Sequence, residues 1–291
     1  MLFTQGITRR ARKWRPPAGA NPWELVCALI ILAGAASMIV PFVWMLSSSL
    51  KTTDQFYNIT SWFIKPLKWE NYLRILGRYN FLLYFYNTLK ITLLSVFGAV
   101  LSCSLVAFAL ARLRFPGRDA IFAFILVSMF LPSQVTLIPI FIIFKNLGFY
   151  NTHLPLVVPA FFGNAFGIFL LRQFFKTIPD ELEDAARVDG CGPFRMYLAV
   201  FVPLVKPALI TLGILTFQGA WGDILNPLIY LVRENLYTMV LGVRQIARSQ
   251  YMPRPELELA GNMILIAPIM LVYLFAQRYF TESIAQTGLK G

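Results

Sequence analysis

The sequence predicts an all-α integral membrane protein, a bundle of six transmembrane helices. Composition is the first indication: 57% of the 291 residues are hydrophobic and only 14% are charged, whereas soluble domains carry about 25% charged residues. The second indication is that the apolar residues gather in long runs. Each run exceeds the roughly 20 residues that a helix needs to cross about 30 Å of hydrocarbon. The same composition excludes a disordered chain, a coiled coil and a disulfide-rich scaffold.

Six apolar runs are assigned to the membrane-spanning helices. They cover residues 23–50, 86–111, 119–144, 153–175, 207–231 and 257–280. All but the second contain proline, at positions 41, 132, 139, 159, 227 and 268. A proline removes a backbone donor, so neighbouring helices or a cavity must satisfy the freed carbonyl group. Two interpretations stay open for these prolines: kinks within a packed bundle, and hinges or breaks that line a pathway.

Basic residues indicate the orientation in the membrane. Residues 1–22 carry five Lys and Arg residues and no acidic residue, and the loop after the second run carries Arg112, Arg114 and Arg118 against Asp119. Cytoplasmic loops are rich in Lys and Arg, so the N-terminus is expected in the cytoplasm. An even number of spans brings the C-terminus to the same side. The first run is too long for a signal-peptide core and has no evident cleavage site, so we expect it to be retained.

This orientation divides the chain into five segments. We expect a basic cytoplasmic N-terminus at 1–22, a first transmembrane helix at 23–50 and a long extracytoplasmic loop at 51–85. A core of five transmembrane helices then covers 86–281, and a cytoplasmic tail covers 282–291.

Several classes of site are excluded by simple counts. The net charge is +12, but the basic residues lie between apolar runs and not on a polar domain, which excludes a nucleic-acid partner and favours contact with lipid. Cys27, Cys103 and Cys191 are too scattered for a disulfide framework or a zinc site, and the single histidine, His153, excludes a multi-histidine metal site. We expect His153 in a loop. No phosphate-binding Gly-x-x-x-x-Gly-Lys-Ser/Thr motif occurs, so no cofactor is expected on this chain.

The most informative segment is polar, the loop 177–206 between the fourth and fifth runs. Its sequence predicts a short helix with Thr177 as N-cap, a Glu183–Arg187 pair four residues apart, and a left-handed stop at Gly190. One face is expected to carry Leu182, Ala185, Ala186 and Asp189. Isolated helices shorter than about 12–15 residues are marginal in water. A helix docked in a groove and a solvated loop helix are therefore both open from the residues alone.

This segment resembles the cytoplasmic loop of binding-protein-dependent ABC importer permeases. Asp184-Ala-Ala, three residues, Gly190, nine residues and Val200-x-Val202-Pro203 keep the spacing of the family's Glu-Ala-Ala, Gly and Ile-x-Leu-Pro pattern. Asp stands for Glu, and Val stands for both Ile and Leu.

The resemblance extends along most of the chain. The turn 111–117, Ala-Arg-Leu-Arg-Phe-Pro-Gly, is similar to the family's cytoplasmic turn after the second span. The segment 221–227, Trp-Gly-Asp-Ile-Leu-Asn-Pro, resembles the family's Trp-Asn-Asp-x-x-x-Pro, with Gly222 in place of Asn. The tail 286–291 resembles that of the smaller permease subunit of maltose-type sugar importers.

The resemblance implies a fold, partners and site residues. It implies the type I ABC importer permease fold with both termini in the cytoplasm, in the inner membrane of a bacterium or archaeon. It implies a heterodimer with a second permease subunit, two ATPase subunits that bind ATP and Mg, and an extracytoplasmic solute-binding protein. In the family the loop docks on the ATPase, which assigns coupling to Glu181, Glu183, Asp184, Ala185, Ala186, Asp189, Gly190 and Pro203. The tail contact would involve Gly288, Lys290 and Gly291.

Polar residues within the spans are candidates for the transport pathway. They are Gln134, Asn164, Gln218, Asp223 and Asn226. An intramembrane carboxylate such as Asp223 is costly and indicates function by default. Hydrogen bonds between helices are the alternative for the whole set, and exposure at the outer end is a further one for Asp223. The resemblance implies that the larger partner builds most of the sugar site.

Basic residues on the predicted outer side leave the substrate class open. Lys145, Arg233, Arg244, Arg248 and Arg254 suit attraction of an acidic oligosaccharide such as alginate, or of an acidic face on the binding protein. Contact with lipid headgroups explains them equally. An ion-coupled secondary transporter is the alternative function, but it would need a midplane ion site in related repeats, and no inverted repeat or carboxylate pair is visible.

Overall fold

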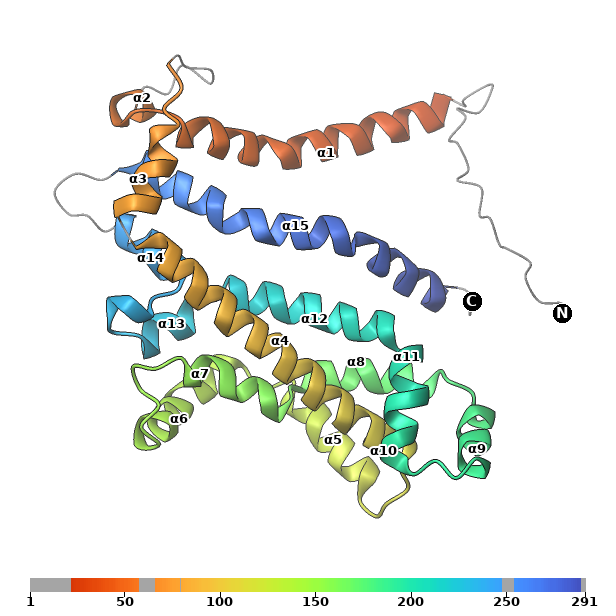
Figure 1. Cartoon of the computed structure of the whole chain (residues 1–291). Helices are drawn as coiled ribbons and strands as arrows, with labels where there is room; N and C mark the ends of the chain where they lie inside the picture. The colour runs from red at the N-terminus through yellow and green to blue at the C-terminus, as the bar shows by residue number, and fades with distance from the viewer. Residues whose placement is uncertain (1–21, 58–65, 79, 248–253, 289–291) are drawn as a thin grey trace, which may run out of the picture.

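A computed structural model describes the backbone of residues 22–57, 66–78, 80–247 and 254–288, and every regular element in these ranges is helical. Long helices lie side by side in Figure 1, from α1 (Pro22–Ser49) through α15 (Pro255–Gly288) and α12 (Lys206–Trp221) to α8 (Ala165–Lys176). Helix α4 (Phe81–Arg112) crosses this row and packs against both α8 and α12. The all-α fold is confirmed for the described residues.

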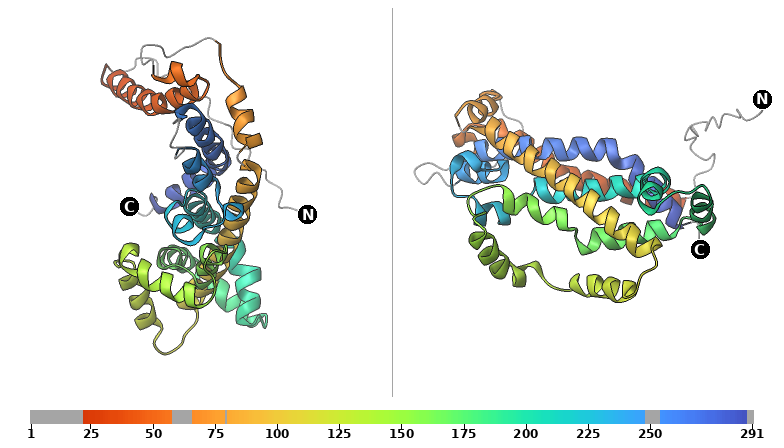
Figure 2. Two further views of the ribbon diagram at one scale, coloured as in Figure 1. Left: turned by 90° about the vertical axis from the view of Figure 1, so that its left-hand side faces the viewer. Right: turned by 60° about the horizontal axis from the view of Figure 1, so that its bottom comes forward.

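The remaining elements are short or lie at the edges of this bundle. Figure 2 shows α5 (Arg118–Ser128) and α6 (Ser133–Asn146) on the side opposite α1. The short elements are α2 (Thr53–Tyr57), α3 (Glu70–Arg78), α7 (Leu154–Val157), η1 (Val158–Phe162), α9 (Asp180–Val188), α10 (Pro193–Met196), the π-helical η2 (Tyr197–Phe201), α11 (Val202–Leu204), α13 (Leu225–Tyr230), η3 (Glu234–Leu236) and α14 (Met239–Ala247).

Four helical stretches in the described residues are long and apolar enough to cross a membrane: Pro22–Ser49, Phe81–Arg112, Leu154–Lys176 and Pro255–Gln277. Two bent pairs bring the number to six if each pair is one span, namely α5 with α6 at 103° and residues 193–204 with α12 at 80°. The start of α1, the end of α15 and α9 all point to the same end of the molecule (Figure 1), as an even number of spans requires.

Breaks in the helices correct two of the expected spans. The third run is not one helix over 119–144, because Pro132 (φ −61°, ψ 134°) leaves the helical region between α5 and α6 and offers no donor to continue the ladder. The fifth run is not continuous over 207–231, because it breaks after Trp221 and resumes as α13. Pro41, Pro139 and Pro268 lie inside their helices, as the kink interpretation expects.

The edges of two expected segments also differ from the structure. Helix α4 begins at Phe81, so the last part of the expected loop 51–85 is helical, and the described part of this loop contains α2 and α3. Helix α15 continues to Gly288, so most of the expected tail 282–291 is the end of this helix. Once the backbone is helical, each further residue adds a hydrogen bond, so helices extend past the apolar run.

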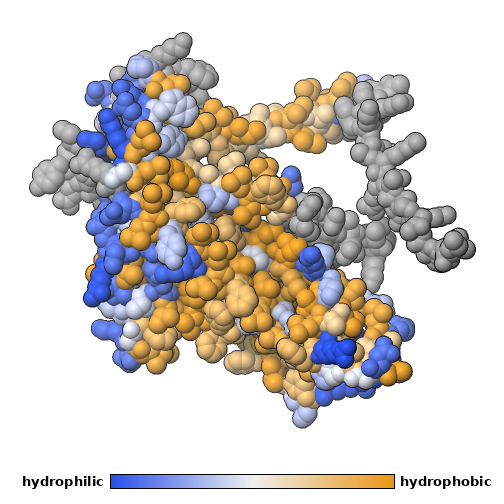
Figure 3. Space-filling view, in the orientation of Figure 1, coloured by the Kyte–Doolittle hydropathy of each residue, from blue (hydrophilic) through white to orange (hydrophobic). Residues whose placement is uncertain are grey.

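Two clusters of buried side chains hold the bundle together. One lies around Phe108 and Phe175, near the end that carries α9, and the other lies around Tyr84 and Trp221, near the end that carries α14. Between the two polar ends the surface is broadly apolar (Figure 3), with exposed side chains such as Ile31. In a bilayer such a surface is in contact with lipid.

Candidate functional site

Helix α9 lies outside the row of long helices at one end of the molecule (Figure 1). Its first turn is acidic, with Asp180, Glu181 and Glu183, which suits the positive end of the helix dipole. Gly190 has a φ of +75°, the left-handed conformation that the sequence predicts at this stop. Helix α9 is therefore a short helix with its own start and its own stop, between α8 and α10.

The start of α9 differs from the expectation. Pro179 occupies the capping position and no side chain caps the helix. Thr177 instead donates its hydroxyl to the carbonyl oxygen of Phe174 at 2.8 Å, within the last turn of α8. The prediction of Thr177 as N-cap was wrong because Pro179, with φ near −58° and extended ψ, already begins the helix two residues later.

Helix α9 turns two side chains toward the bundle and leaves the others exposed. Glu183 and Ala186 are buried against the bundle. Leu182 and Val188 are 42% and 88% exposed, and Glu181, Asp184, Ala185, Asp189 and Gly190 are exposed as well. Pro203 is exposed in α11, outside α9. Of the face expected to dock on a partner, Leu182, Ala185 and Asp189 are exposed and Ala186 is buried, and the helix turns Glu183 toward a buried arginine.

That arginine is Arg112, the last residue of α4. Its side chain is 5% exposed, and it donates to Asp180 Oδ1 at 2.5 Å and lies 3.6 Å from Glu183 Oε2. It also donates to the carbonyl oxygens of Phe175, at 3.1 Å from Nε and 2.5 Å from Nη2, and of Ile178. Arg187 completes the group by pairing with Glu183 Oε1 at 2.5 Å, which is the pair that the sequence predicts.

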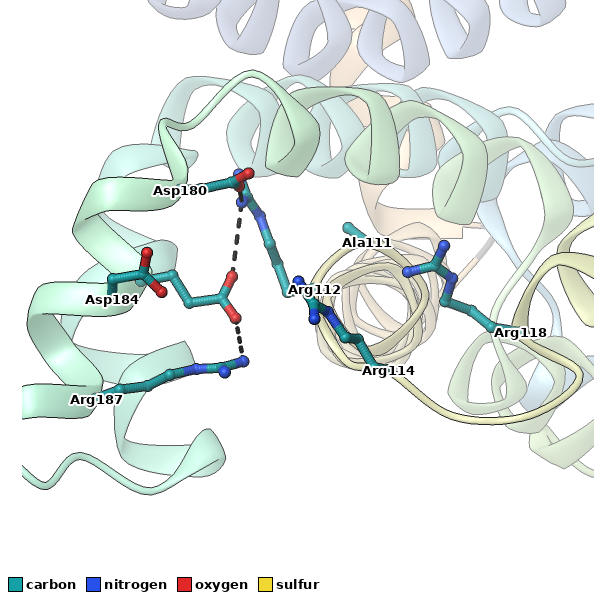
Figure 4. Close-up of a pocket in the computed structure, with 8 residues that line it drawn as sticks. Ala111, Arg112, Arg114, Arg118, Asp180, Asp184 and Arg187 are labelled. Atoms are coloured by element: carbon teal, nitrogen blue, oxygen red, sulfur yellow. Dashed lines mark hydrogen bonds and ion pairs between the residues drawn. The ribbon is translucent and has the colours of Figure 1, made fainter.

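A polar hollow of about 300 Å³ separates α9 from the turn after α4 (Figure 4). Four arginines and three carboxylates line it: Arg112, Arg114, Arg118, Arg187, Asp180, Glu183 and Asp184. The two segments that carry the family resemblance, 111–117 and 184–203, therefore meet here. The sequence analysis missed the partnership of Arg112 with α9, although a basic turn and an acidic loop expected on one side of the membrane pointed to it.

A second hollow, of about 350 Å³, contains two of the expected pathway residues. Asn164 and Asp223 line it together with Ser95, Leu212 and Thr216, among others. Gln134, Gln218 and Asn226 do not line it, and all three are exposed.

The two expected pathway residues in this hollow, Asn164 and Asp223, also have local partners. Asn164 Oδ1 accepts the backbone N–H of Gly167 at 2.7 Å and caps α8. Asp223 accepts the backbone N–H of Asn226 at 3.2 Å and its side-chain amide at 2.7 Å, at the start of α13. These hydrogen bonds fix the two side chains at the wall of the hollow.

The other singled-out residues are dispersed. His153 precedes α7, as expected of a loop residue, and its Nε2 lies 2.8 Å from the carbonyl oxygen of Leu236. Arg244 lines a small hollow of about 120 Å³ with Tyr237 and Gln245. Lys145 and Arg233 are exposed and Arg254 is half-buried. Gly288 ends α15. Residues 1–21 of the expected N-terminal segment lie outside the described ranges, as do Arg248, Lys290 and Gly291.

Nothing in the described ranges suggests a metal site, since no group of three His, Cys, Asp or Glu residues could hold an ion there. The described residues therefore offer an exposed short helix, α9, and two polar hollows.

Comparison with known proteins gives consistent matches. Residues 103–286 match the family described as binding-protein-dependent transport system inner membrane component. The chain is 34% identical over 254 residues to the probable ABC transporter permease protein YurM of Bacillus subtilis (86% of this chain, 83% of that protein). It is 30% identical over 263 residues to the diacetylchitobiose uptake system permease protein NgcG of Streptomyces coelicolor (89% and 86%).

The fold has solved counterparts. It is similar to a chain in the crystal structure of a bacterial ABC transporter involved in the import of the acidic polysaccharide alginate. The TM-score is 0.79 at 23% identity, over 89% of this chain and 96% of that chain.

Proposed function

The chain belongs to the family of binding-protein-dependent transport system inner membrane components, and we propose that it pairs with a second permease subunit to enclose the path of an oligosaccharide. It is a multi-pass membrane protein and a transport component of an ABC importer, not an enzyme. The energy source is then ATP, bound with Mg on two partner ATPase subunits. An extracytoplasmic binding protein delivers the sugar.

The observation that carries this proposal is the exposure of α9. A helix outside the bundle would normally turn its apolar side chains inward, yet Val188 is 88% exposed and Leu182 is 42% exposed. The acidic residues Glu181, Asp184 and Asp189 surround them on the exposed side. A helix of nine residues is too short to be stable alone in water, and exposed apolar side chains on such a helix support a docking surface. We assign it to an ATPase subunit, and we place α9 and both termini in the cytoplasm, with the chain in the inner membrane.

Transport follows from movement of this docked helix. ATP binding closes the ATPase dimer and displaces α9, and the displacement reorients the helices so that the cavity opens outward. Sugar enters from the binding protein and leaves inward after hydrolysis. The hollow lined by Asn164 and Asp223 supplies this subunit's polar groups to the pathway, while Gly288, Lys290 and Gly291 of the tail reach toward the ATPase. Core residues 86–281, with the loop 177–206, carry these roles.

The substrate is proposed from the relatives and from charge. NgcG is named for diacetylchitobiose, and a 26% identical protein of Bacillus subtilis is named for arabinooligosaccharides, so the class is an oligosaccharide. Arg233 and Arg244, toward the end of the molecule opposite α9, favour an acidic one such as alginate. Uptake of an acidic oligosaccharide should fall in Arg244→Gln while uptake of a neutral one does not. An equal effect on both sugars would remove the acidic assignment.

The docking assignment is tested by co-purification. The tagged chain is expressed with the proteins encoded beside it, solubilised in mild detergent and recovered by its tag. We expect a second permease subunit and an ATPase in the eluate, with ATP hydrolysis. Val188→Asp places a charge on the exposed side of α9. This variant should recover the second permease subunit but not the ATPase. Val232→Asp is the matched control, because Val232 is an exposed valine distant from α9. Retention of the ATPase by Val188→Asp would contradict the docking surface.

A further inference from the structure

Two buried arginines cross between the ends of α4 and α8. Arg112 of α4 donates to the carbonyl oxygens of Phe175 and Ile178, at and just beyond the end of α8. Arg172 of α8 donates in the opposite direction, from Nε to the carbonyl oxygen of Leu110 in the last turn of α4, at 3.1 Å. Both side chains are almost fully buried, at 5% and 6% exposure. Each helix thus supplies the cation that caps the carbonyl end of the other.

The reciprocal arrangement satisfies groups that would otherwise be costly. The last four carbonyl groups of a helix have no partner within it, and cations are favourable at that end. A buried guanidinium is stable only when its donors are used. Stacking completes the surroundings of both groups, because Arg112 lies 5.0 Å from the ring centroid of Phe201 and Arg172 lies 3.7 Å from that of Phe122.

Only one of the two arginines also holds α9. Arg112 reaches Asp180 and Glu183 of α9 in addition to the carbonyl groups of α8. Arg172 reaches Asp119 of α5, at 3.7 Å. Arg112 is therefore the point at which α9, α8 and α4 are joined by one rigid planar group, which a flexible ammonium could not reproduce.

The far end of α4 is joined as firmly to another segment. Tyr84 donates its hydroxyl to Glu234 Oε1 at 2.8 Å, and Asn87 Nδ2 donates to the carbonyl oxygens of Asn235 and Tyr237 at 2.9 and 3.0 Å. The backbone N–H of Met239 donates to Thr88 at 2.9 Å. Helix α4 has 32 residues, about 48 Å at 1.5 Å per residue. It links α9 to the segment of η3 and α14 at the opposite end.

We propose that Arg112 is a positioning residue that fixes α9 to α4, so that α4 moves as a lever and carries the displacement of α9 to the η3–α14 segment at the opposite end. The inference rests on the proposed function, since the displacement originates in the ATPase. Movement reaches the far side through a buried guanidinium and one long helix, in addition to the route along the chain from α9 into α10 and α12.

The first test measures rigidity in the assembled complex with Arg112 intact. Spin labels are placed at the partly exposed Cys191, whose backbone N–H donates to the carbonyl oxygen of Ala186 in α9 at 2.9 Å, and at a cysteine that replaces the exposed Leu101 of α4. Cys27 is replaced by serine, and the buried Cys103 is kept. The distance between the labels should be the same without nucleotide and after trapping with ATP and vanadate. A distance that changes with nucleotide would overturn the proposal, whatever the Arg112 variants do.

The second test compares two variants of basic residues. Arg112→Gln should lower the sugar transported per ATP hydrolysed by at least about fivefold, the lower end of usual coupling effects, and should make the label distance depend on nucleotide. Lys176→Gln is the matched control, because Lys176 is an exposed cation at the end of α8, lines neither hollow, and makes no hydrogen bond or ion pair within the described ranges. Normal coupling in Arg112→Gln would refute the role of Arg112. A wild-type chain that recruits no ATPase would instead refute the proposed function.

The far end of the lever is tested by a double-mutant cycle. Tyr84→Phe removes the hydroxyl that reaches Glu234 and keeps the buried ring. Each substitution should reduce the sugar transported per ATP hydrolysed. If both residues act through α4, the reduction in the double variant should be smaller than the product of the two single reductions. The reason is that α4, once detached from α9 by Arg112→Gln, no longer carries movement to Glu234, so the loss of the Tyr84 hydroxyl has little further effect. Independent, multiplicative losses would show that movement reaches η3 and α14 without α4.

Discussion

Gly167, in the first turns of α8, should tolerate no side chain, and the cost can be worked out from its neighbours. A Cβ atom there would lie 2.9 Å from Cys103 Sγ of α4, 3.0 Å from Leu212 Cδ1 of α12 and 3.2 Å from Asn164 Oδ1. Gly213 of α12 is the matched control, because a Cβ atom there would lie 3.6 Å from Val96, also of α4. Alanine gains about 1 kcal/mol over glycine in a helix at either position.

The difference between the two alanine variants isolates the steric cost. Overpacking costs about 1–3 kcal/mol, and helix propensity cancels between the two positions. Gly167→Ala should therefore be about 1–3 kcal/mol less stable than Gly213→Ala, which is about a 5- to 150-fold difference in the unfolding equilibrium.

The assay is unfolding of the purified chain by sodium dodecyl sulfate in mixed micelles, followed by tryptophan fluorescence. If unfolding is irreversible, the unfolding rates of the two variants are compared in its place. Stabilities that agree within about 0.5 kcal/mol would refute the close contact of α8 with α4 and α12, because that is the usual scatter between independent sites. The packing of α8 against α4, which positions α9, would then need another explanation.

Three further predictions concern separate features. Gly190→Ala should destabilise α9 by about 1–2 kcal/mol, because Gly190 has a φ of +75°. Gly192→Ala should not destabilise α9, because Gly192 has no positive φ and open space surrounds it. The rate of proteolysis of the loop measures the effect of both substitutions. Trp221→Phe should cost about 0.5–1.5 kcal/mol, because it loses the 2.9 Å bond from Nε1 to the carbonyl oxygen of Leu265; unchanged unfolding would contradict this. Burial, with the nearby Lys90, lowers the pKa of His153 below its ordinary 6.5. Below about pH 6.5 the unfolded chain therefore binds more protons than the folded chain, and stability should fall as the pH drops. His153→Gln should lose this pH dependence, and a pH profile of stability identical to that of the unchanged protein would refute the prediction.

Hydropathy predicts the spanning helices well, because a backbone in lipid must satisfy its own polar groups and only a helix does so within one segment. It does not locate the breaks. Pro41, Pro139 and Pro268 lie inside continuous helices, whereas Pro132 separates α5 from α6. The outcome at each proline depends on which neighbouring groups donate to the freed carbonyl oxygen, and hydropathy does not contain that information.

Gly163 and Gly167, four residues apart in the fourth apolar run, have different roles in the structure. Gly163-x-x-x-Gly167 predicts close helix approach, and Gly167 does lie against α4 and α12. Gly163 has a different role, because its φ of +78° allows the chain to turn between η1 and α8. A motif of spacing alone cannot separate close packing from a backbone conformation.

The candidate site was predictable in its local features and not in its long-range ones. The Glu183–Arg187 pair and the stop at Gly190 follow from neighbours four residues or fewer away. The bond from Arg112 to Asp180 joins residues 68 positions apart, and it forms only because α4 and α8 end at the same level. That pairing turns Glu183 toward the bundle, which the pattern of residues within α9 does not predict.

The energy source of transport tests the central claim most directly. The complex is reconstituted in vesicles with ATP enclosed and binding protein outside, and uptake of oligosaccharide is followed with and without ionophores that collapse ion gradients. We predict uptake that requires ATP and binding protein and is insensitive to the ionophores. Uptake that proceeds without ATP and stops when the ion gradient is collapsed would contradict the account and establish ion-coupled secondary transport in its place.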